Sequence, residues 1–298
     1  MKHHALLATL CLLATSCTGI PDRGIEASAA STITLASWNM EHLAERNGSG
    51  CRPRTDADYA AMRDYVDALA ADVIAFQEVE SRAAAERVFD PSRYSVVIET
   101  RIGTGRNGEC GGRPGLTINA QRTGFAIRKG LAFDRLADVT DVQVGNPDLR
   151  SGVDVIVRPV NGTPIRLLSV HLKAGCSAGD RNDACATLFE QLPMLERWID
   201  ARASEEIRFA VLGDFNRRLV MPGDKVWADW DDALPANADL ARASGDQSAR
   251  CNPRYKDFID YIVLDRRATA DQLDFDERTF TADPLSDHCA ITTRLRLQ

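Results

Sequence analysis

The sequence lacks several features that would assign it to a simple class. No Cys-x-x-Cys pair occurs, so a structural zinc site is not expected. No internal repeat is visible, and no change of composition or Pro/Ser-rich linker interrupts the chain after residue 31. The net charge of -7 at pH 7 argues against a broad basic surface that would bind nucleic acid anywhere. The net charge does not exclude a local basic groove.

Length and composition allow a large core. The chain has 298 residues, of which 44% are hydrophobic and 27% charged. That length permits one large domain or two small ones. Because nothing in the sequence marks a linker, we predict a leader at residues 1–30 and a single catalytic domain over residues 31–298.

The N-terminal stretch MKHHALLATLCLLATSC has a positive start, an apolar run of about a dozen residues and small residues before Cys17. Such a run is typical of a secretory signal and is too short to span a membrane. Cleavage before Cys17 would leave a lipidated N-terminus and membrane attachment, although Ala14 stands where Leu is usual; cleavage after Ala29 would not. We favour the first route. Either predicts an extracytoplasmic protein: a periplasmic or cell-surface lipoprotein, or a secreted chain.

The cysteines agree with export. The chain has eight, and Cys11 and Cys17 lie in the leader, which leaves Cys51, Cys110, Cys176, Cys185, Cys251 and Cys289. An even number in an exported chain predicts disulfides, but the sequence does not fix how they pair. Cys176 with Cys185 is the simplest pair, since it closes one short loop.

Strand-like segments dominate the chain after residue 31. They lie at residues 33–38, 72–80, 94–98, 124–127, 153–157, 165–171, 209–212, 258–264 and 291–297. Thr55 and Asp58 form the pattern of a capping box, which predicts a helix with Tyr59, Met62, Val66 and Leu69 on its apolar face. A second helix carries Leu188, Leu192, Leu195 and Ile199 on one face, and Pro193 either bends it or marks its start. The pattern favours two stacked sheets with helices outside.

The longest segment without predicted structure runs from residue 101 to 123 and is rich in Gly. A loop of this length in a compact domain is typically functional or disordered. Its arginines, at positions 101, 106, 113 and 122, could supply local positive charge. Its GTGRNG matches the dinucleotide-binding pattern, but no helix is predicted after it, so we do not expect a nucleotide site there.

Polar side chains stand where several of the apolar runs end or begin. In FAVLGDFNRR the run stops at a Gly, and Asp214 and Asn216 point the same way because extended residues two apart share a face. The pattern recurs at Asn39, Glu78, His171, Asp260, Asp287 and His288. Each alone could cap a turn or be a satisfied polar group. So many together favour an active site.

These residue types suit phosphoester hydrolysis. Carboxylates such as Glu78 and Asp287 can hold Mg²⁺, with Mn²⁺ or Ca²⁺ as alternatives, and the ion offsets charge that builds on phosphoryl oxygens. An imidazole can remove a proton from water near neutral pH, and a carboxylate behind it fixes its tautomer. His288 with Asp260 fits that pair.

The motifs SWNM, FQEV, SVHLKAG, LGDFN, IDYIVL and SDH resemble, in this order, those of the endonuclease/exonuclease/phosphatase superfamily. Pancreatic-type deoxyribonucleases, exonuclease III-like enzymes, sphingomyelinases and inositol polyphosphate phosphatases belong to it. The resemblance extends from about residue 33 to the C-terminus. It implies an α+β fold, a four-layer α/β/β/α sandwich of two stacked mixed sheets flanked by helices, with a single site at one rim of the sheets.

The resemblance also implies a role for each candidate residue. Glu78 would be the main metal ligand, with Asn39 and Asp287 near the ion, and Asp214 and Asn216 would orient phosphate and the attacking water. His288 backed by Asp260 would be the base, although Asp214 is the alternative, and His171 would donate to the phosphate or the leaving group. Arg150 stands where deoxyribonuclease-like members place an Arg that binds phosphate.

One position departs from the deoxyribonuclease pattern. That branch has a Glu beside the imidazole that corresponds to His171, and the nearest match here is Gln121. A Gln does not support a charged imidazole as a carboxylate does. Whether His171 acts as an acid therefore stays open.

Three functions compete. We predict a monomeric, exported, metal-dependent phosphodiesterase acting on nucleic acid, for which Arg217 and Arg218 after LGDFN could contact phosphates. The alternative is a phosphatase or phospholipase acting on lipid head groups or small phosphate esters. That function should need an exposed apolar loop, and KVWADW at residues 225–230 is the candidate. A noncatalytic binding module has no need for the full polar set.

Overall fold

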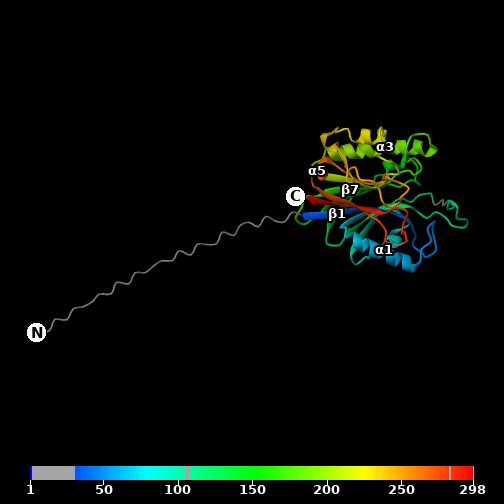
Figure 1. The fold of residues 1–298 in the computed structure, drawn as a ribbon, viewed down its shortest axis with the longest axis horizontal. Coiled ribbons are helices and arrows are strands. Elements are labelled where there is room, and N and C mark those ends of the chain that lie inside the picture. Colours follow the sequence, from blue (N-terminus) through cyan, green and yellow to red (C-terminus); the bar gives the residue numbers. More distant parts are fainter. Residues whose placement is uncertain (2–30, 105–107, 282, 298) are drawn as a thin grey trace.

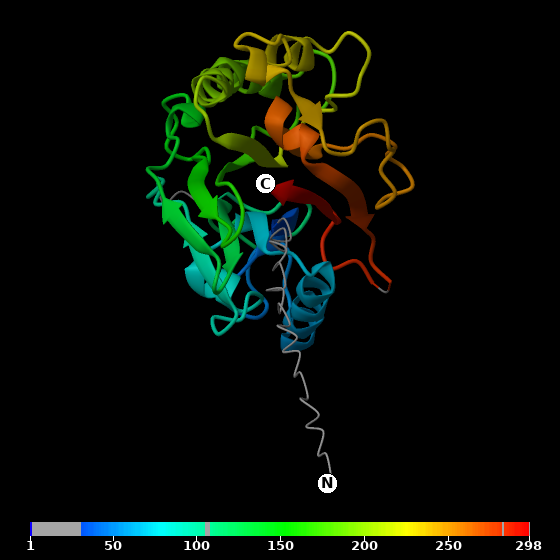
Figure 2. The same cartoon turned by 90° about the vertical axis from the view of Figure 1, so that its left-hand side faces the viewer.

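The computed structural model describes Met1 and residues 31–104, 108–281 and 283–297. Two six-stranded sheets are stacked face to face, with α1 against the outer face of one and α3 against the outer face of the other (Figures 1 and 2). The four-layer α/β/β/α sandwich is therefore confirmed. The predicted leader lies outside the described residues.

The first sheet has the order β11-β12-β1-β2-β4-β3. Its strands span Ser31–Leu43 (β1), Val73–Val79 (β2), Tyr94–Ile98 (β3), Arg122–Arg128 (β4), Gln272–Arg278 (β11) and Ala290–Leu297 (β12). β1 and β2 run parallel, and the other pairs are antiparallel.

The second sheet has the order β5-β6-β7-β8-β10-β9. Its strands span Ala132–Arg135 (β5), Val153–Arg158 (β6), Ile165–His171 (β7), Arg208–Asp214 (β8), Ala241–Arg242 (β9) and Asp260–Leu264 (β10). Here β7 and β8 are the parallel pair and all other neighbours are antiparallel. The two sheets thus share one pairing pattern.

The helices span Asp56–Leu69 (α1), Arg82–Glu86 (α2), Asp183–Ala203 (α3), Lys225–Trp230 (α4) and Arg266–Ala270 (α5), with short 3₁₀ turns at Asp141–Gln143 and Ala236–Ala238. The Thr55–Asp58 capping box is present, and the predicted apolar face of α1 is buried. Pro193 lies inside α3, so the alternative that it marks the start of the helix is wrong. The helix begins after Asn182, whose side chain accepts from the Ala184 N–H.

Two hydrophobic clusters fill the sandwich. The larger joins the facing sides of both sheets to α3, and includes Leu35, Phe125 and Leu167. The smaller joins the outer side of the first sheet to α1, and includes Trp38 and Phe76. Strands β5, β9 and β11 were not predicted because they lie at sheet edges and few of their side chains are buried.

Three disulfides are present: Cys51–Cys110, Cys176–Cys185, which joins a loop to the first turn of α3, and Cys251–Cys289. The prediction for Cys176 and Cys185 is confirmed. Within the described ranges, we find no helix with the length and hydropathy needed to cross a bilayer.

Candidate active site

The candidate site lies at one end of the sandwich, because the strand directions bring the ends of six strands there. The carboxyl ends of β1 and β2 are neighbours, as are those of β7 and β8. Strand β10 runs antiparallel to β8, so its first residue, Asp260, pairs with Asp214 at the last position of β8. The antiparallel β12 likewise begins beside the end of β1.

The structure brings all nine predicted site residues into one connected set of contacts. They are Asn39, Glu78, Arg150, His171, Asp214, Asn216, Asp260, Asp287 and His288. They come from positions 39 to 288 of the chain and lie together at one end of the sandwich. Their chemical roles remain predictions.

The Glu78 carboxylate accepts two hydrogen bonds from residues of the first sheet. It accepts from Asn39 Nδ2 at 3.4 Å and from the His42 N–H at 3.1 Å. The backbone of Glu78 has φ +60°, a left-handed conformation that costs free energy in a residue with a Cβ. The strand is bent here, between Phe76 and Val79. The bend turns the Glu78 carboxylate toward the second sheet, where His171 Nε2 lies 3.8 Å away.

His42 is a site residue that the sequence did not predict. Its Nε2 lies 3.6 Å from a Glu78 oxygen, and Gln121 Nε2 lies 3.5 Å from its Nδ1. Strict alternation would place His42 on the opposite face from Asn39. Positive φ values at Glu41 and His42 break the alternation. The only available signal was an imidazole a few residues beyond Asn39 on the same strand.

The buried Arg54 holds the end of β1, where Glu41 and His42 have positive φ. The Arg54 guanidinium donates to the carbonyls of Met40 at 2.8 Å, Glu41 at 3.0 Å and Leu285 at 3.0 Å. Burial lowers the pKa of Arg54 to about 10, so it stays charged at neutral pH. It joins the end of β1 to the segment before β12, and so positions both sides of the site.

The second sheet supplies an acid and an imidazole from neighbouring strand ends. Asp214 accepts from Asn39 Nδ2 at 3.0 Å and from the Asn216 N–H at 2.8 Å. His171 Nε2 lies 3.6 Å from the same carboxylate. The glycine of LGDFN is required because a Cβ at Gly213 would lie 1.9 Å from the Val170 carbonyl oxygen. The two parallel strands therefore approach closely just before the site.

Arg150 and Asn216 support the loop after β7. Arg150 donates to the carbonyls of His171 and Leu172 at 3.2 and 2.8 Å. Asn216 Nδ2 donates to the Leu172 carbonyl at 3.2 Å. Both side chains thus hold the backbone at and next to His171.

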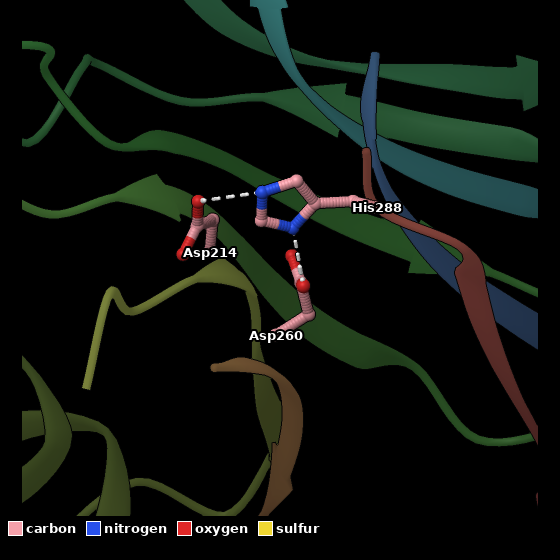
Figure 3. Close-up of side chains that lie close together, drawn as sticks. All are labelled: Asp214, Asp260 and His288. Carbon is pink, nitrogen blue, oxygen red and sulfur yellow. Dashed lines mark hydrogen bonds and ion pairs between the residues drawn. The ribbon is translucent and has the colours of Figure 1, made fainter. Parts of the chain in front are cut away.

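His288 and Asp260 form a short pair, as Figure 3 shows. His288 Nδ1 lies 2.6 Å from Asp260 Oδ2, and Nε2 faces Asp214 Oδ2 at 3.9 Å. Burial disfavours the charged imidazole, but Asp260 and then Asp214 outweigh it and raise the pKa of His288 well above 6.5. The predicted carboxylate behind the imidazole is in place.

The pKa values of Asp214 and His171 shift in opposite directions. Burial and the nearby Asp260 raise the pKa of Asp214 to about 7. Burial, followed by the positive charges of Arg150 and His288, lowers the pKa of His171 well below 6.5. His171 is therefore neutral at pH 7, which makes it a hydrogen-bond donor rather than a cation. Its Nδ1 is buried without a partner among the described residues.

The residues after β11 and before β12 are held against β1. The Asp287 N–H donates to Glu41 Oε2 at 2.8 Å, and Trp38 Nε1 donates to the His288 carbonyl at 3.0 Å. The Asp287 side chain is 63% exposed, and one oxygen lies 3.8 Å from His288 Nε2. Asp287 thus stands at the open rim of the site, where a solvated ion could reach it.

The donor set fits a divalent cation. Four carboxylates, Glu78, Asp214, Asp260 and Asp287, gather at this end of the sandwich, and Asp260 Oδ1 is buried without a partner among the described residues. Hard carboxylate oxygens are what Mg²⁺, Mn²⁺ and Ca²⁺ bind. Ligand atoms of Asp214, Asp260 and His288 also lie within 4.8 Å of one another, which is a second arrangement that could hold an ion.

Gln121 and Arg217 do not lie where the sequence led us to expect them. Gln121 contacts His42, and no contact with His171 is present in the described part of the chain. Arg217 is buried in an ion pair with Asp224 at 2.6 Å, so it does not face a phosphate path. Arg101 pairs with Glu99, while Arg113 and Arg122 donate to backbone carbonyls of other loops. Arg101, Arg113 and Arg122 thus connect residues 101–123 to neighbouring segments. Arg106 and part of GTGRNG lie outside the described residues.

A sequence model of the Endonuclease/Exonuclease/phosphatase family matches residues 36–288. The chain belongs to this family. Members of the family are phosphoester hydrolases, so the chain has the fold and the polar set of such an enzyme. A comparison with curated protein sequences gives no match.

Solved structures of family members share the fold. The human Nocturnin catalytic domain with bound sulfate is 15% identical with a TM-score of 0.63, and the match covers 90% of this chain and 95% of that one. D. rerio TDP2 complexed with single strand DNA product is 17% identical with a TM-score of 0.60, covering 89% and 98%. ANGEL2, a 2',3'-cyclic phosphatase, is 14% identical with a TM-score of 0.56, covering 90% and 95%.

Proposed function

We propose that this chain is an exported, metal-dependent phosphodiesterase that hydrolyses nucleic acid by attack of water on phosphorus. The observation that supports the proposal most is the convergence of Glu78, Asp214 and the His288–Asp260 pair at one end of the sandwich. A noncatalytic binding module would have no use for a carboxylate suited to bind a metal ion beside a histidine–aspartate pair suited to act as a general base.

Water activation is assigned to the second sheet and the segment before β12. His288 accepts the proton of the attacking water through Nε2, while Asp260 holds Nδ1–H and supports the imidazolium that forms. The 3.9 Å gap between His288 Nε2 and Asp214 Oδ2 would let one water contact both. Asp214 then orients that water. Asp214 is the alternative base, since its pKa of about 7 suits proton transfer near neutral pH.

Phosphate binding is assigned to neutral and cationic donors on both sheets. Nε2–H of neutral His171 can donate to a nonbridging oxygen or to the leaving oxygen, and the amide of Asn216 can donate beside it. Asn39 holds both Glu78 and Asp214 in place. Arg150, behind His171, contributes positive charge.

Glu78, with Asp287 and Asn39 beside it, would hold the divalent ion, and Mg²⁺ is our first choice, ahead of Mn²⁺ and Ca²⁺. When bound, the ion supplies positive charge that offsets the charge developing on the phosphoryl oxygens. The excess of carboxylates around Glu78 would otherwise repel an anionic substrate.

The substrate class rests on relatives of the same fold. TDP2 is solved with a single strand DNA product, which favours nucleic acid. ANGEL2 is described as a 2',3'-cyclic phosphatase, which favours the alternative of a smaller phosphate ester. For the lipid alternative the chain offers little, because KVWADW forms the short helix α4 with Val226 and Trp230 buried.

Export and domain organisation complete the proposal. Three disulfides in the described chain suit an oxidising compartment. We propose a leader at residues 1–30 and one catalytic domain at residues 31–298 that acts as a monomer. For the leader we prefer lipidation at Cys17 to the alternative of cleavage after Ala29.

The test incubates the purified protein with plasmid DNA, RNA, a phosphocholine lipid and bis(4-nitrophenyl) phosphate, each with Mg²⁺ and with chelator. We expect chelator-sensitive cleavage of DNA or RNA that is lost in His288→Ala and in Glu78→Ala. Cleavage of the lipid alone would transfer the proposal to the alternative. Activity that survives both substitutions would contradict the proposed site.

A further inference from the structure

The loop before β10 combines an exposed aromatic ring with unpaired cations, in a protein whose overall charge is negative. Tyr255 is 51% exposed, and Arg254 and Lys256 on either side of it are exposed as well. No carboxylate pairs with either cation in the described part of the chain. We call residues 249–257 the Tyr255 loop.

An arginine from a second loop reaches the same ring. The Arg218 guanidinium carbon lies 5.9 Å from the centre of the Tyr255 ring, within the range of a cation–π contact. Arg218 Nε also lies 4.0 Å from an Asp257 oxygen. Arg218 thus lies against the Tyr255 ring, and Arg254 and Lys256 adjoin Tyr255 in the sequence. Of the three cations, Arg218 alone has an acidic partner among the described residues.

The Tyr255 loop is connected to the candidate site by the chain itself and by a disulfide. Lys256 precedes Asp260 closely in sequence, and Arg218 follows Asn216. The Cys251–Cys289 disulfide, with Cα atoms 5.6 Å apart, joins the loop to the residue next to His288. Within the loop, the Ala249 N–H donates to the Lys256 carbonyl at 2.8 Å, and the Tyr255 N–H donates to the Asn252 carbonyl at 3.0 Å.

We propose that the Tyr255 loop, with Arg218, binds a single-stranded polynucleotide as it leaves the catalytic site: a base stacks on Tyr255, and neighbouring phosphates bind Arg218, Arg254 and Lys256. This inference rests on the proposed function and adds to it a strand preference. Stacking on an aromatic side chain requires an unpaired base whose face is open, while cations alone read only the phosphate backbone. The ring therefore favours a single strand over a duplex.

The test measures binding of a fluorescein-labelled oligothymidylate, and of a duplex of equal length, by fluorescence anisotropy in chelator, so that no cleavage occurs. Tyr255→Ala should weaken binding of the single strand about 5- to 150-fold, the loss expected for one stacked base. Tyr255→Phe should retain nearly all of the binding, because the ring is kept. The duplex should bind less tightly than the single strand and respond little to either change.

The charges make a separate contribution. Arg254→Ala with Lys256→Ala should weaken both ligands and lower the salt dependence of single-strand binding by a slope of about 1.4, as expected for two lost phosphate contacts. Lys129→Ala is the matched control, because Lys129 is exposed after β4, whose antiparallel pairing with β2 places it at the end of the sandwich away from Glu78. This control should bind and cleave as the unchanged protein does.

Two results would overturn the inference: single-strand binding in Tyr255→Ala equal to that of the unchanged protein, or an equal loss on single strand and duplex. Neither touches the proposed function, which depends on metal-dependent turnover of a phosphodiester. An unchanged protein that binds the oligonucleotide through Tyr255 but cleaves no phosphodiester would contradict the proposed function instead.

Discussion

The two sheets of the sandwich are built alike and end differently. Each has a parallel pair, β1–β2 or β7–β8, whose strands are connected through a long helix and flanked by antiparallel partners. In the first sheet, left-handed residues at Glu41, His42 and Glu78 bend both strand ends. In the second, β7 and β8 stay in register through His171 and Asp214, and positive φ occurs at Gly213 within β8 and at Asn216 beyond it.

This difference in backbone gives the two sheets different side-chain environments at the site. The bent ends of the first sheet gather backbone and amide donors around one carboxylate, Glu78, as a metal ligand would need. The in-register ends of β7 and β8 place a neutral imidazole beside an acid of raised pKa, as proton transfer and phosphate binding would need. The frame is common to both sheets, and the local backbone at each strand end decides what the site can do.

The largest expected effect comes from removing the group that acts on water. His288→Ala should lower kcat for a phosphodiester by about 10²- to 10⁴-fold, the usual contribution of a general base. Glu78→Ala should have an effect of similar size and should also abolish the rise in unfolding temperature that Mg²⁺ causes. Steady-state kinetics and thermal unfolding with and without Mg²⁺ measure both. Glu190→Ala, on the exposed side of α3, is the control and should change neither.

The next effect is on stability and separates buried from exposed ion pairs in the second sheet. Asp154 is buried and accepts from Arg166 at 2.7 Å and from Trp198 Nε1 at 3.0 Å. Asp154→Ala should lower the free energy of unfolding by about 1–3 kcal/mol, because it leaves the buried Trp198 Nε1–H without its acceptor and Arg166 with Glu205 as its remaining acidic partner. Asp134→Ala removes an exposed pair with Arg158 and should cost less than about 1 kcal/mol. Equal losses in denaturant unfolding would contradict this account.

Two disulfides that close loops of different length should differ in how much they stabilise the fold. Replacing Cys251 and Cys289 with Ser opens a loop of sequence separation 38, whereas Cys176 and Cys185 close one of separation 9. The first change should therefore cost more of the free energy of unfolding, within the range of about 2–4 kcal/mol, because it frees more chain in the unfolded state. It should also lower kcat, since Cys289 adjoins His288. A larger loss for the Cys176–Cys185 pair would contradict the account.

The smallest expected effect is a shift in the pH dependence of catalysis. A base must be neutral, so activity should rise as pH increases through the pKa of His288, which Asp260 holds well above 6.5. Asp260→Asn removes the strongest contribution that raises this pKa, so the acid limb of the kcat profile should move to lower pH, by about 1–3 units. Rate profiles between pH 5 and 10 measure it. A limb that stays in place would contradict the role of Asp260.

Sequence patterns predicted the central strands and the polar residues at their ends. Apolar runs located most central strands, and the polar residue at each run's end located Asn39, Glu78, His171 and Asp214. The edge strands β5 and β11 escaped notice because charged side chains alternate there without a buried run. The common pairing pattern of the two sheets has no counterpart in the sequence, because it depends on which strands become neighbours.

The site residues that were missed depend on irregular backbone. His42 reaches Glu78 only because Glu41 and His42 adopt positive φ, and Arg54 holds that bend by bonding carbonyls from distant segments. Arg217, which by its place after LGDFN could have contacted phosphates, is instead paired with Asp224. Neither outcome follows from residue type or spacing, since both depend on contacts made only in the folded chain.

The most direct test of the central claim is a crystal structure with Mn²⁺ bound, in which anomalous scattering locates the ion. The account predicts a peak within bonding distance of the Glu78 carboxylate, with His288 free of the ion and still paired with Asp260. A peak held by Asp214, Asp260 and His288 together would contradict it, because an imidazole bound to metal could not accept the proton of water.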